Sequence, residues 1–591
     1  MSILHALTSL YDRLESSGKA PSYGFSRENT SYAILLSPEG SLSDVLDMRD
    51  TSARTPRPRR LEVPRAVKRT GQPAPNFLWD KTSFVLGAGT GASSRVLREH
   101  AAFKAFHERQ LASSNDEGAQ ALLRFLRGWR VEEYHDLPHA LEMLDTSIVF
   151  SLEDEMQFLH KRSSVKQIWL DHLTSEQGAS GLCLVTGEQT SIARLHPSVK
   201  GVAGAQGSGA SIVSFDKDAF KSFGKERGAN APVSERAAFA YATSLNTLLE
   251  RGSRQRIRIG DATTLFWADA SGNEAKASAA EGFFLEFLSG PPTDEEEAAK
   301  IRDKLAAVTQ GRPLFEVDPE VDEDTRFFVL GLAPNAARLS IRFWYEDSIG
   351  AISRRIGEHW RDLHLEPTPW RTPPSARRLL YETAVQRKAE SIPPTLTGAV
   401  MRAILSGGRY PRSLLTTVIV RMRTDKEITG LRIAICKASL ARDHRLGFEE
   451  EDVPVSLNPD ETNPAYRLGR LFAVYENVQR AALGNVNATI KDRFFASASA
   501  TPASVFPLLE RSASNHIASL RKGDKGGLAH WFEKEIDSIF SGVGSTFPRS
   551  LRLEDQGRFA IGYHHQRATK RGTPESEGEG IGTGTHEGSQ P

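Results

Sequence analysis

From residue 375 onward, nearly every segment of the sequence carries the apolar spacing of an amphipathic helix. In the segment 464–482, apolar residues recur at three- and four-residue steps, and arginines fall outside that stripe. The stripe consists of Leu468, Leu471, Phe472, Tyr475 and Val478, against Arg467, Arg470 and Arg480. The predicted helices are 375–390, 395–407, 411–423, 430–442, 464–482, 488–499, 503–521, 528–541 and 554–570. Helices of this length with short connections bury a shared core as a bundle, so this part is predicted to be all-helical.

The N-terminal part instead mixes strand-like and helix-like segments. Apolar runs at 31–36 and 41–46, joined by Pro38-Glu39-Gly40, predict a hairpin. Further strands are predicted at 77–86, 146–151, 263–267, 326–332 and 338–344, and helices at 96–111, 119–126, 164–173 and 235–249. Residues 268–280 and 291–297 are predicted as a linker, with the acidic 294–297 opening a helix to about Val308. The predicted fold class is α+β: an N-terminal mixed α/β domain, then an all-helical region ending in a helical bundle.

Turn residues near 454 mark a boundary inside the helical region. Pro454 and the Asn458-Pro459-Asp460 turn end one segment, and Pro464 suits the first turn of a helix. We therefore predict an N-terminal α/β domain at 1–370, a helical connecting region at 371–454 and a bundle at 455–570. The tail 571–591 is rich in Gly and Glu with almost no apolar residues, so it is predicted to be disordered.

Composition excludes several classes of protein. The chain has 591 residues, of which 39% are hydrophobic and 25% charged, as in ordinary globular proteins. No apolar run is long enough for a membrane span, and the first residues lack the pattern of a secretory signal. Two cysteines, Cys183 and Cys436, cannot build a disulfide framework or a four-cysteine zinc site. We expect a cytoplasmic protein with no membrane partner.

A basic stretch interrupts this balanced composition. Residues 51–70 hold seven Lys or Arg and a single acid, Glu62, and three prolines disfavour a regular helix. We call residues 54–69 the basic arm; its cations are Arg54, Arg57, Arg59, Arg60, Arg65, Lys68 and Arg69. An arm of this composition is typical of a loop that contacts phosphates. A solvated surface loop is the alternative.

Two further groups of cations are candidates for nucleic-acid contacts. In 338–344, Leu339, Ile341 and Phe343 are predicted to face the core, which leaves Arg338, Arg342 and Trp344 on the other face. This face either binds nucleic acid or is covered and paired with acids; both interpretations stay open. In the bundle, helix ends and loops carry Lys491, Arg493, Arg521 and Lys522, which either follow a single strand or are solvated.

Catalytic and cofactor motifs find no support. The glycines at 87, 89 and 91 have GxGxG spacing, which differs from the dinucleotide fingerprint. The glycine-rich 204–209 is followed by Ala210, where a phosphate-binding loop has lysine. His135 and His139 flank Pro138 and lack the glutamate of a zinc-protease motif. We predict no catalytic residue, no metal and no cofactor.

Three sets of residues carry a resemblance to a known family. They are Pro75-Asn-Phe-Leu-Trp-Asp-Lys-Thr-Ser-Phe-Val-Leu-Gly87; Cys183-Leu-Val-Thr-Gly-Glu188 with Ile192-Ala-Arg-Leu-His-Pro-Ser-Val-Lys-Gly201; and Pro334-Asn-Ala-Ala-Arg-Leu-Ser-Ile-Arg-Phe-Trp344 with Asn487-Ala-Thr-Ile-Lys-Asp-Arg493. Together they closely resemble the large subunit of the type I-C CRISPR Cascade surveillance complex. The resemblance runs from the first helix to about residue 570.

The resemblance implies a non-catalytic DNA-binding subunit of an RNA-guided antiviral complex. In that family the N-terminal domain lies beside the subunit that holds the 5′ handle of the guide RNA (crRNA). It recognises the protospacer-adjacent motif on duplex DNA and helps separate the strands. The C-terminal bundle helps hold the displaced strand of the R-loop, and the same region is also made as a separate small subunit. Other implied partners are the backbone subunits and a helicase–nuclease that performs cleavage.

The resemblance also suggests where the motif is recognised. The family places a polar base reader in the loop that follows the basic arm, which corresponds here to Gln72, with Asn76 as the neighbouring candidate. An amide both donates and accepts hydrogen bonds, which suits base edges in a groove. An enzyme with an unrecognised nucleic-acid-processing site and a structural scaffold of a ribonucleoprotein are the alternative functions.

Overall fold

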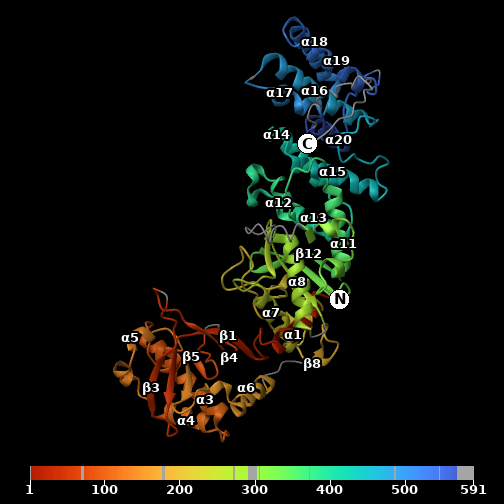
Figure 1. The fold of residues 1–591 in the computed structure, drawn as a ribbon. Coiled ribbons are helices and arrows are strands. Elements are labelled where there is room, and N and C mark those ends of the chain that lie inside the picture. Colours follow the sequence, from red (N-terminus) through yellow and green to blue (C-terminus); the bar gives the residue numbers. More distant parts are fainter. Residues whose placement is uncertain are drawn as a thin grey trace, which may run out of the picture. The chain divides into compact units, whose positions relative to one another are not determined.

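The computed structural model describes residues 2–52, 54–67, 69, 72–175, 180–270, 273–289, 303–304, 306–371, 373–484, 487–544 and 546–568. The chain divides into two compact units (Figure 1). The first unit comprises residues up to 256 with 269–274 and 333–340; the second comprises 257–268, 275–332 and the chain from 341 onward. Strands and helices alternate in the N-terminal part and helices follow, which confirms the predicted α+β class.

A four-stranded sheet forms the core of the first unit. Its strands are β2 (Tyr32–Leu36), β3 (Leu42–Asp47), β5 (Trp79–Lys81) and β6 (Ser147–Leu152), in the order β3-β2-β6-β5. Strands β2 and β3 pair antiparallel, which confirms the predicted hairpin, whereas β2 and β6 pair parallel. Three helices pack on one face: α3 (Ser93–Leu111), α4 (Glu117–Gly128) and α6 (Ser163–Ser175). Alternate residues of β2, such as Ile34, point into this core.

A two-stranded ribbon covers the opposite face of the sheet. Strands β1 (Phe25–Thr30) and β4 (Arg59–Pro64) pair antiparallel. Leu61 and Val63 of β4 pack against Ala33, Val149 and Trp79. The prediction of an irregular arm was therefore incomplete, because Leu61 and Val63 alternate with Arg60 and Glu62, and this apolar pair is buried on the sheet.

Two further segments differ from the prediction. The single strand predicted at 77–86 is β5 followed by α2 (Thr82–Val85), after a turn in which Leu78 takes a φ of +62°. The linker predicted at 268–280 contains the start of α8 (Glu274–Ser289), whose Ala277 and Ala280 are buried. Alanine has the highest helix propensity, but its low hydrophobicity gives no clear apolar stripe, so the sequence pattern did not indicate this helix. Residues 291–297, predicted as linker and helix start, lie outside the described residues.

The remainder of the first unit is built around two packed helices. Helix α1 (Ile3–Ser16) packs on α7 (Glu235–Leu248), and the Ser244 hydroxyl donates to the Leu7 carbonyl at 2.9 Å. The Tyr11 ring meets Phe239 edge-on. Short elements complete the unit: α5 (Ala140–Met143), β7 (Ser180–Leu182) and β8 (Gln189–Ser191).

A second four-stranded sheet precedes the C-terminal helices in the sequence, and most of its residues belong to the second unit. Its order is β12-β11-β10-β9, with β9 (Arg256–Ile259), β10 (Ala262–Asp269), β11 (Arg326–Asn335) and β12 (Arg338–Ser348). The three predicted strands of this sheet are confirmed. In β12, Leu339 and Phe343 are buried as predicted, but Ile341 is 45% exposed, so its assignment to the core was wrong.

Helices make up the rest of the second unit (Figure 1). The sequence analysis did not identify α10 (Leu314–Val317) or α11 (Ile349–Leu363). The segment predicted as one helix at 375–390 is an α-helix only over α12 (Ala376–Tyr381), and two short 3-10 helices follow at Val385–Arg387 and Ala389–Ser391. The other predicted helices are confirmed as α13 (Pro394–Ser406), α14 (Arg412–Asp425), α15 (Gly430–Arg445), α16 (Pro464–Leu483), α17 (Ile490–Ala498), α18 (Pro502–Lys522), α19 (Gly526–Phe540) and α20 (Leu553–Ala568). In the described part of the chain, no helix has the length and apolar character needed to cross a membrane.

The last helix packs on both sides of the predicted boundary at 454. A Cβ added to Gly562 would lie 2.1 Å from the Tyr466 carbonyl oxygen, so α20 and α16 approach closely only because glycine stands there. On another face, Gly557 of α20 lies against Leu440 of α15. The buried Arg558 donates to the carbonyls of Asp452 and Glu451 at 2.9 and 2.6 Å. Whether 455–570 folds alone stays a prediction, and these contacts favour a fragment that includes α14 and α15.

Candidate nucleic-acid interface

Backbone hydrogen bonds hold the basic arm at Arg57, directly before strand β4. Arg57 and Asp50 exchange two of them, at 2.8 and 3.0 Å. Strand β4 follows directly. Since Leu61 and Val63 point inward, Arg60 and Glu62 point to the opposite side of the ribbon. The packing of Leu61 and Val63 on the sheet therefore fixes the direction of Arg60.

The cations at the start of the arm are exposed. Arg54, Arg57 and Arg59 are exposed, and their side chains form no salt bridge within the described residues. Arg60 reaches Glu250 at 3.3 Å, with 55% of its side chain accessible. Exposed pairs of this kind contribute about 0–1 kcal/mol, so a phosphate can replace the carboxylate at little cost.

The far end of the arm is anchored instead. The Arg69 guanidinium donates to both oxygens of Asp80 (2.6 Å to Oδ1) and to the Ala74 carbonyl at 2.8 Å, and it lies over the Phe84 ring. Asp80 is fully buried. Burial raises the pKa of the Asp80 carboxyl, and the Arg69 charge opposes that rise. Arg69 is therefore a structural residue in this conformation, contrary to its predicted role at the DNA; Lys68 lies outside the described residues.

The two base-reader candidates occupy different environments. Gln72 is exposed at the loop and has no side-chain hydrogen bond among the described residues. Asn76 is 4% exposed; its side-chain Oδ1 accepts from the Val67 backbone amide at 2.9 Å, and its backbone N–H donates to Asp80 Oδ2 at 2.8 Å. The prediction for Asn76 is corrected, because a buried amide that closes the loop cannot meet a base edge. Asn76 and Arg69 together hold the loop that presents Gln72.

The buried His107 is hydrogen-bonded to Leu78, close to the end of the same loop. Leu78, with its positive φ, donates its amide to His107 Nε2 at 2.8 Å, and His107 Nδ1 donates to the Phe103 carbonyl. Burial lowers the pKa of His107 to about 4, so the ring is neutral. The Phe77 ring is stacked with both His107 and Trp169. The sequence analysis missed Asp80 and His107, because a buried polar group has no signal in local sequence.

The cations of β12 are paired with acids. Arg342 donates twice to Asp261 Oδ2, at 2.9 and 2.7 Å. Arg338 donates to Asp216 at 2.9 Å and to the Ser214 carbonyl at 2.8 Å. Trp344 stacks on Phe328, with 5.6 Å between ring centroids. Of the two interpretations left open, the structure favours the paired face over a face free to bind nucleic acid.

The four cations of the bundle have mixed environments. Lys491 pairs with its neighbour Asp492 at 3.3 Å, and Arg521 pairs with Glu533. Arg493 and Lys522 are exposed and form no salt bridge within the described residues. These two are the bundle cations that remain available to a strand.

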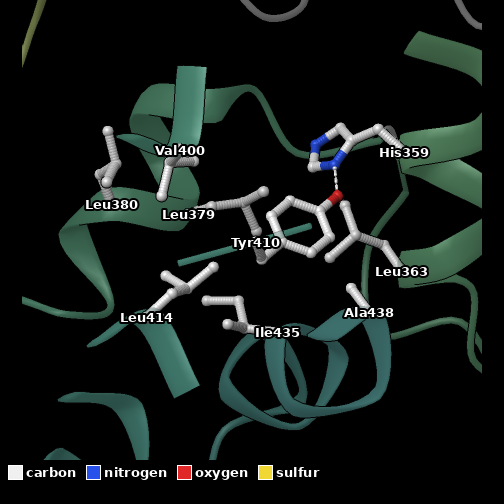
Figure 2. A pocket seen from close by; sticks show the side chains of 9 residues that line it. All are labelled: His359, Leu363, Leu379, Leu380, Val400, Tyr410, Leu414, Ile435 and Ala438. Atoms are coloured by element: carbon white, nitrogen blue, oxygen red, sulfur yellow. Dashed lines mark hydrogen bonds between the residues drawn. The ribbon is translucent and has the colours of Figure 1, made fainter. Parts of the chain in front are cut away.

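The hollow drawn in Figure 2 is lined mainly by apolar side chains. It lies among helices of the second unit, and seven of its nine lining side chains are aliphatic. The remaining two, His359 and Tyr410, hydrogen-bond to each other. Burial and the nearby Arg442 charge lower the pKa of His359 well below its usual value. Among the described residues, no three metal-binding side chains are grouped so as to hold an ion.

Comparison with known proteins assigns the chain to a family. No curated protein matches the sequence. A family model described as a CRISPR-associated protein (Cas_Csd1) matches residues 7–570, which is nearly the whole chain and includes both the arm and the bundle. The chain therefore belongs to the Cas_Csd1 family of CRISPR-associated proteins.

Proposed function

We propose that this protein is the non-catalytic large subunit of a type I-C CRISPR surveillance complex and recognises the protospacer-adjacent motif on duplex DNA. The observation that carries the proposal is the contrast within 54–76: exposed arginines lead to a loop that is anchored at both ends and presents Gln72. Sequence recognition in such complexes is delegated to RNA–DNA pairing, so the protein needs phosphate contacts and few base contacts.

Neutralising the arm tests the phosphate contacts. The triple variant Arg57→Ala, Arg59→Ala, Arg60→Ala should bind target DNA at least about ten-fold more weakly, to a similar degree for all sequences. The slope of log affinity against log salt should become shallower by roughly 2–3, because about 0.9 is lost for each phosphate contact. Unchanged affinity and slope would remove the arm from the interface.

Gln72→Ala tests the base contact separately. A lost base-edge contact costs about 1–3 kcal/mol for the matched motif only. We expect binding to a matched motif to fall while binding to non-specific duplex is retained. The matched control is Gln157→Ala, an amide elsewhere in the first unit. A variant that keeps the wild-type ratio between matched and mismatched motifs would place the base reader outside this loop.

The remaining roles are part of the same proposal. In them the bundle helps hold the displaced strand of the R-loop through Arg493 and Lys522, and the assembled complex recruits a helicase–nuclease. The alternative, a nucleic-acid-processing enzyme, predicts cleavage by the chain alone. Purified chain with Mg²⁺ or Mn²⁺ should leave single- and double-stranded DNA intact, and specific cleavage would overturn the non-catalytic assignment.

The family resemblance further implies a small subunit made from the C-terminal region. Met422, the last methionine, lies in α14, so a product that begins near 455 needs another start codon. We expect the fragment 411–568 to melt cooperatively, since it keeps the contacts of Gly557 and Arg558. The fragment 455–568 should be helical but less stable. An unfolded 411–568 would show that the bundle depends on the rest of the chain.

A further inference from the structure

We propose that Phe223 is a stacking platform for an unpaired base of the target DNA, an inference that rests on the DNA-binding function proposed above. Phe223 is 98% exposed, so both faces of its ring are open to solvent. A large apolar side chain in this position stabilises nothing within the chain. Aromatic rings presented in this way bind single-stranded nucleic acid, because every base has a face that stacks.

The backbone holds the ring at the tip of a tight hairpin. The Lys225 amide donates to the Ser222 carbonyl at 2.9 Å, and the two residues between them have positive φ, +49° for Phe223 and +69° for Gly224. Two consecutive positive φ values define a turn that favours Asn-Gly. A phenylalanine at the first position is strained, and strain of this kind concentrates at functional sites.

Side chains beneath the turn keep it in place. The Asn230 carboxamide accepts from the Ser222 amide at 3.0 Å and donates to the carbonyls of Lys225 and Arg227, both at 3.1 Å. Lower in the loop, the Arg338 guanidinium lies 3.8 Å from the centre of the Phe220 ring. The hydrogen bonds of Asn230 therefore hold the turn that carries Phe223, and all of these residues belong to the first unit.

Charges around the ring favour DNA over an apolar protein surface. The acids of the loop are used internally: Asp216 pairs with Arg338, and Asp218 and Glu226 both pair with Lys221. Lys217 and Lys225 are exposed and form no salt bridge among the described residues. Lys217 and Lys225 flank the exposed ring in sequence, and cations near an aromatic ring suit a base and its phosphates, whereas a protein partner needs a wider apolar patch.

The test uses the full-length chain and a single-stranded oligonucleotide that contains 2-aminopurine, whose fluorescence falls when it stacks. Phe223→Asn removes the ring but suits a positive φ, so the turn is kept. Phe223→Trp keeps a stacking ring. Leu141→Ala, which truncates another exposed apolar side chain of the first unit, is the matched control.

We expect F223N to weaken binding of the single strand about ten-fold and to abolish the quenching, with F223W and L141A close to wild type. All variants should bind fully paired duplex equally well. Wild-type binding and quenching by F223N would overturn the proposal. A chain that binds no DNA would instead overturn the proposed function, which the arm variant tests independently.

Discussion

The arginines at the start of the basic arm and those of strand β12 lie in opposite environments. Arg57 and Arg59 in the arm are exposed and form no salt bridge among the described residues. Arg338 and Arg342 in β12 each donate to an aspartate at less than 3 Å. Both regions were candidates for nucleic-acid contacts, the arm because of its cluster of cations and β12 because one strand face carries two arginines and a tryptophan.

The difference shows that a cluster of cations identifies a binding surface only when the acidic side chains that pair with those cations in the folded protein are known. The partners of Arg338 and Arg342, Asp216 and Asp261, lie 122 and 81 residues away in sequence. A guanidinium that is already held by a carboxylate must give up that bond before it can bind a phosphate. Arg57 and Arg59 form no salt bridge among the described residues, so they meet no such cost.

The largest effect on the free energy of unfolding is expected at the anchored end of the arm, where Arg69 is bound to Asp80. Asp80→Ala removes the buried carboxylate that holds Arg69 and the Asn76 amide, so we expect the free energy of unfolding to fall by about 3 kcal/mol. Arg59→Ala, at the exposed end, should change it by less than about 0.5 kcal/mol. Urea denaturation of both variants measures this. Equal effects would show that the two ends of the arm do not differ.

The next effect compares β12 directly with the arm. The double variant Arg338→Gln, Arg342→Gln should lower the unfolding free energy by about 1–2 kcal/mol, because it breaks two partly exposed ion pairs. Its affinity for duplex DNA should stay within about two-fold of wild type, since these side chains are engaged elsewhere. A loss of affinity as large as that of the arm variant would contradict the comparison.

A pH titration separates the support of the loop from the arm. Burial lowers the pKa of His107 to about 4, below the 6.5 of the unfolded chain. The unfolded state therefore binds more protons between these values, and stability is complete above pH 6.5 and falls as pH decreases toward 4. We expect His107 to account for a loss of about 1 kcal/mol between pH 7 and 5.5. His107→Gln should reduce this pH dependence; an unchanged slope would exclude His107 as its source.

The smallest effect is expected from freeing a paired arginine. Asp261→Asn removes the negative charge that holds Arg342, while the side chain stays similar in size. The salt dependence of DNA binding should become steeper by less than about 0.9, the contribution of one phosphate contact. A slope that steepens by more than this would show that the ion pair with Asp261 is the only difference between Arg342 and the arginines of the arm.

The sequence by itself determined the elements that depend on local spacing. The apolar stripe of 464–482 became α16, and the two runs around Pro38-Glu39-Gly40 became the β2–β3 hairpin. Helix periodicity and turn chemistry involve residues within a few positions of one another, so a single segment contains the information. The long ordered blocks also carried the family resemblance, which the family model bears out at the level of a CRISPR-associated protein.

Only the tertiary structure decided which polar residues are available. Asn76 looked like a base reader but closes a loop on Val67, and Arg69 looked like a phosphate contact but holds Asp80. Strand β4 was hidden because its apolar partners, Ala33 and Val149, come from distant segments. Burial and ion pairing depend on residues that meet only after folding, and no local pattern records them.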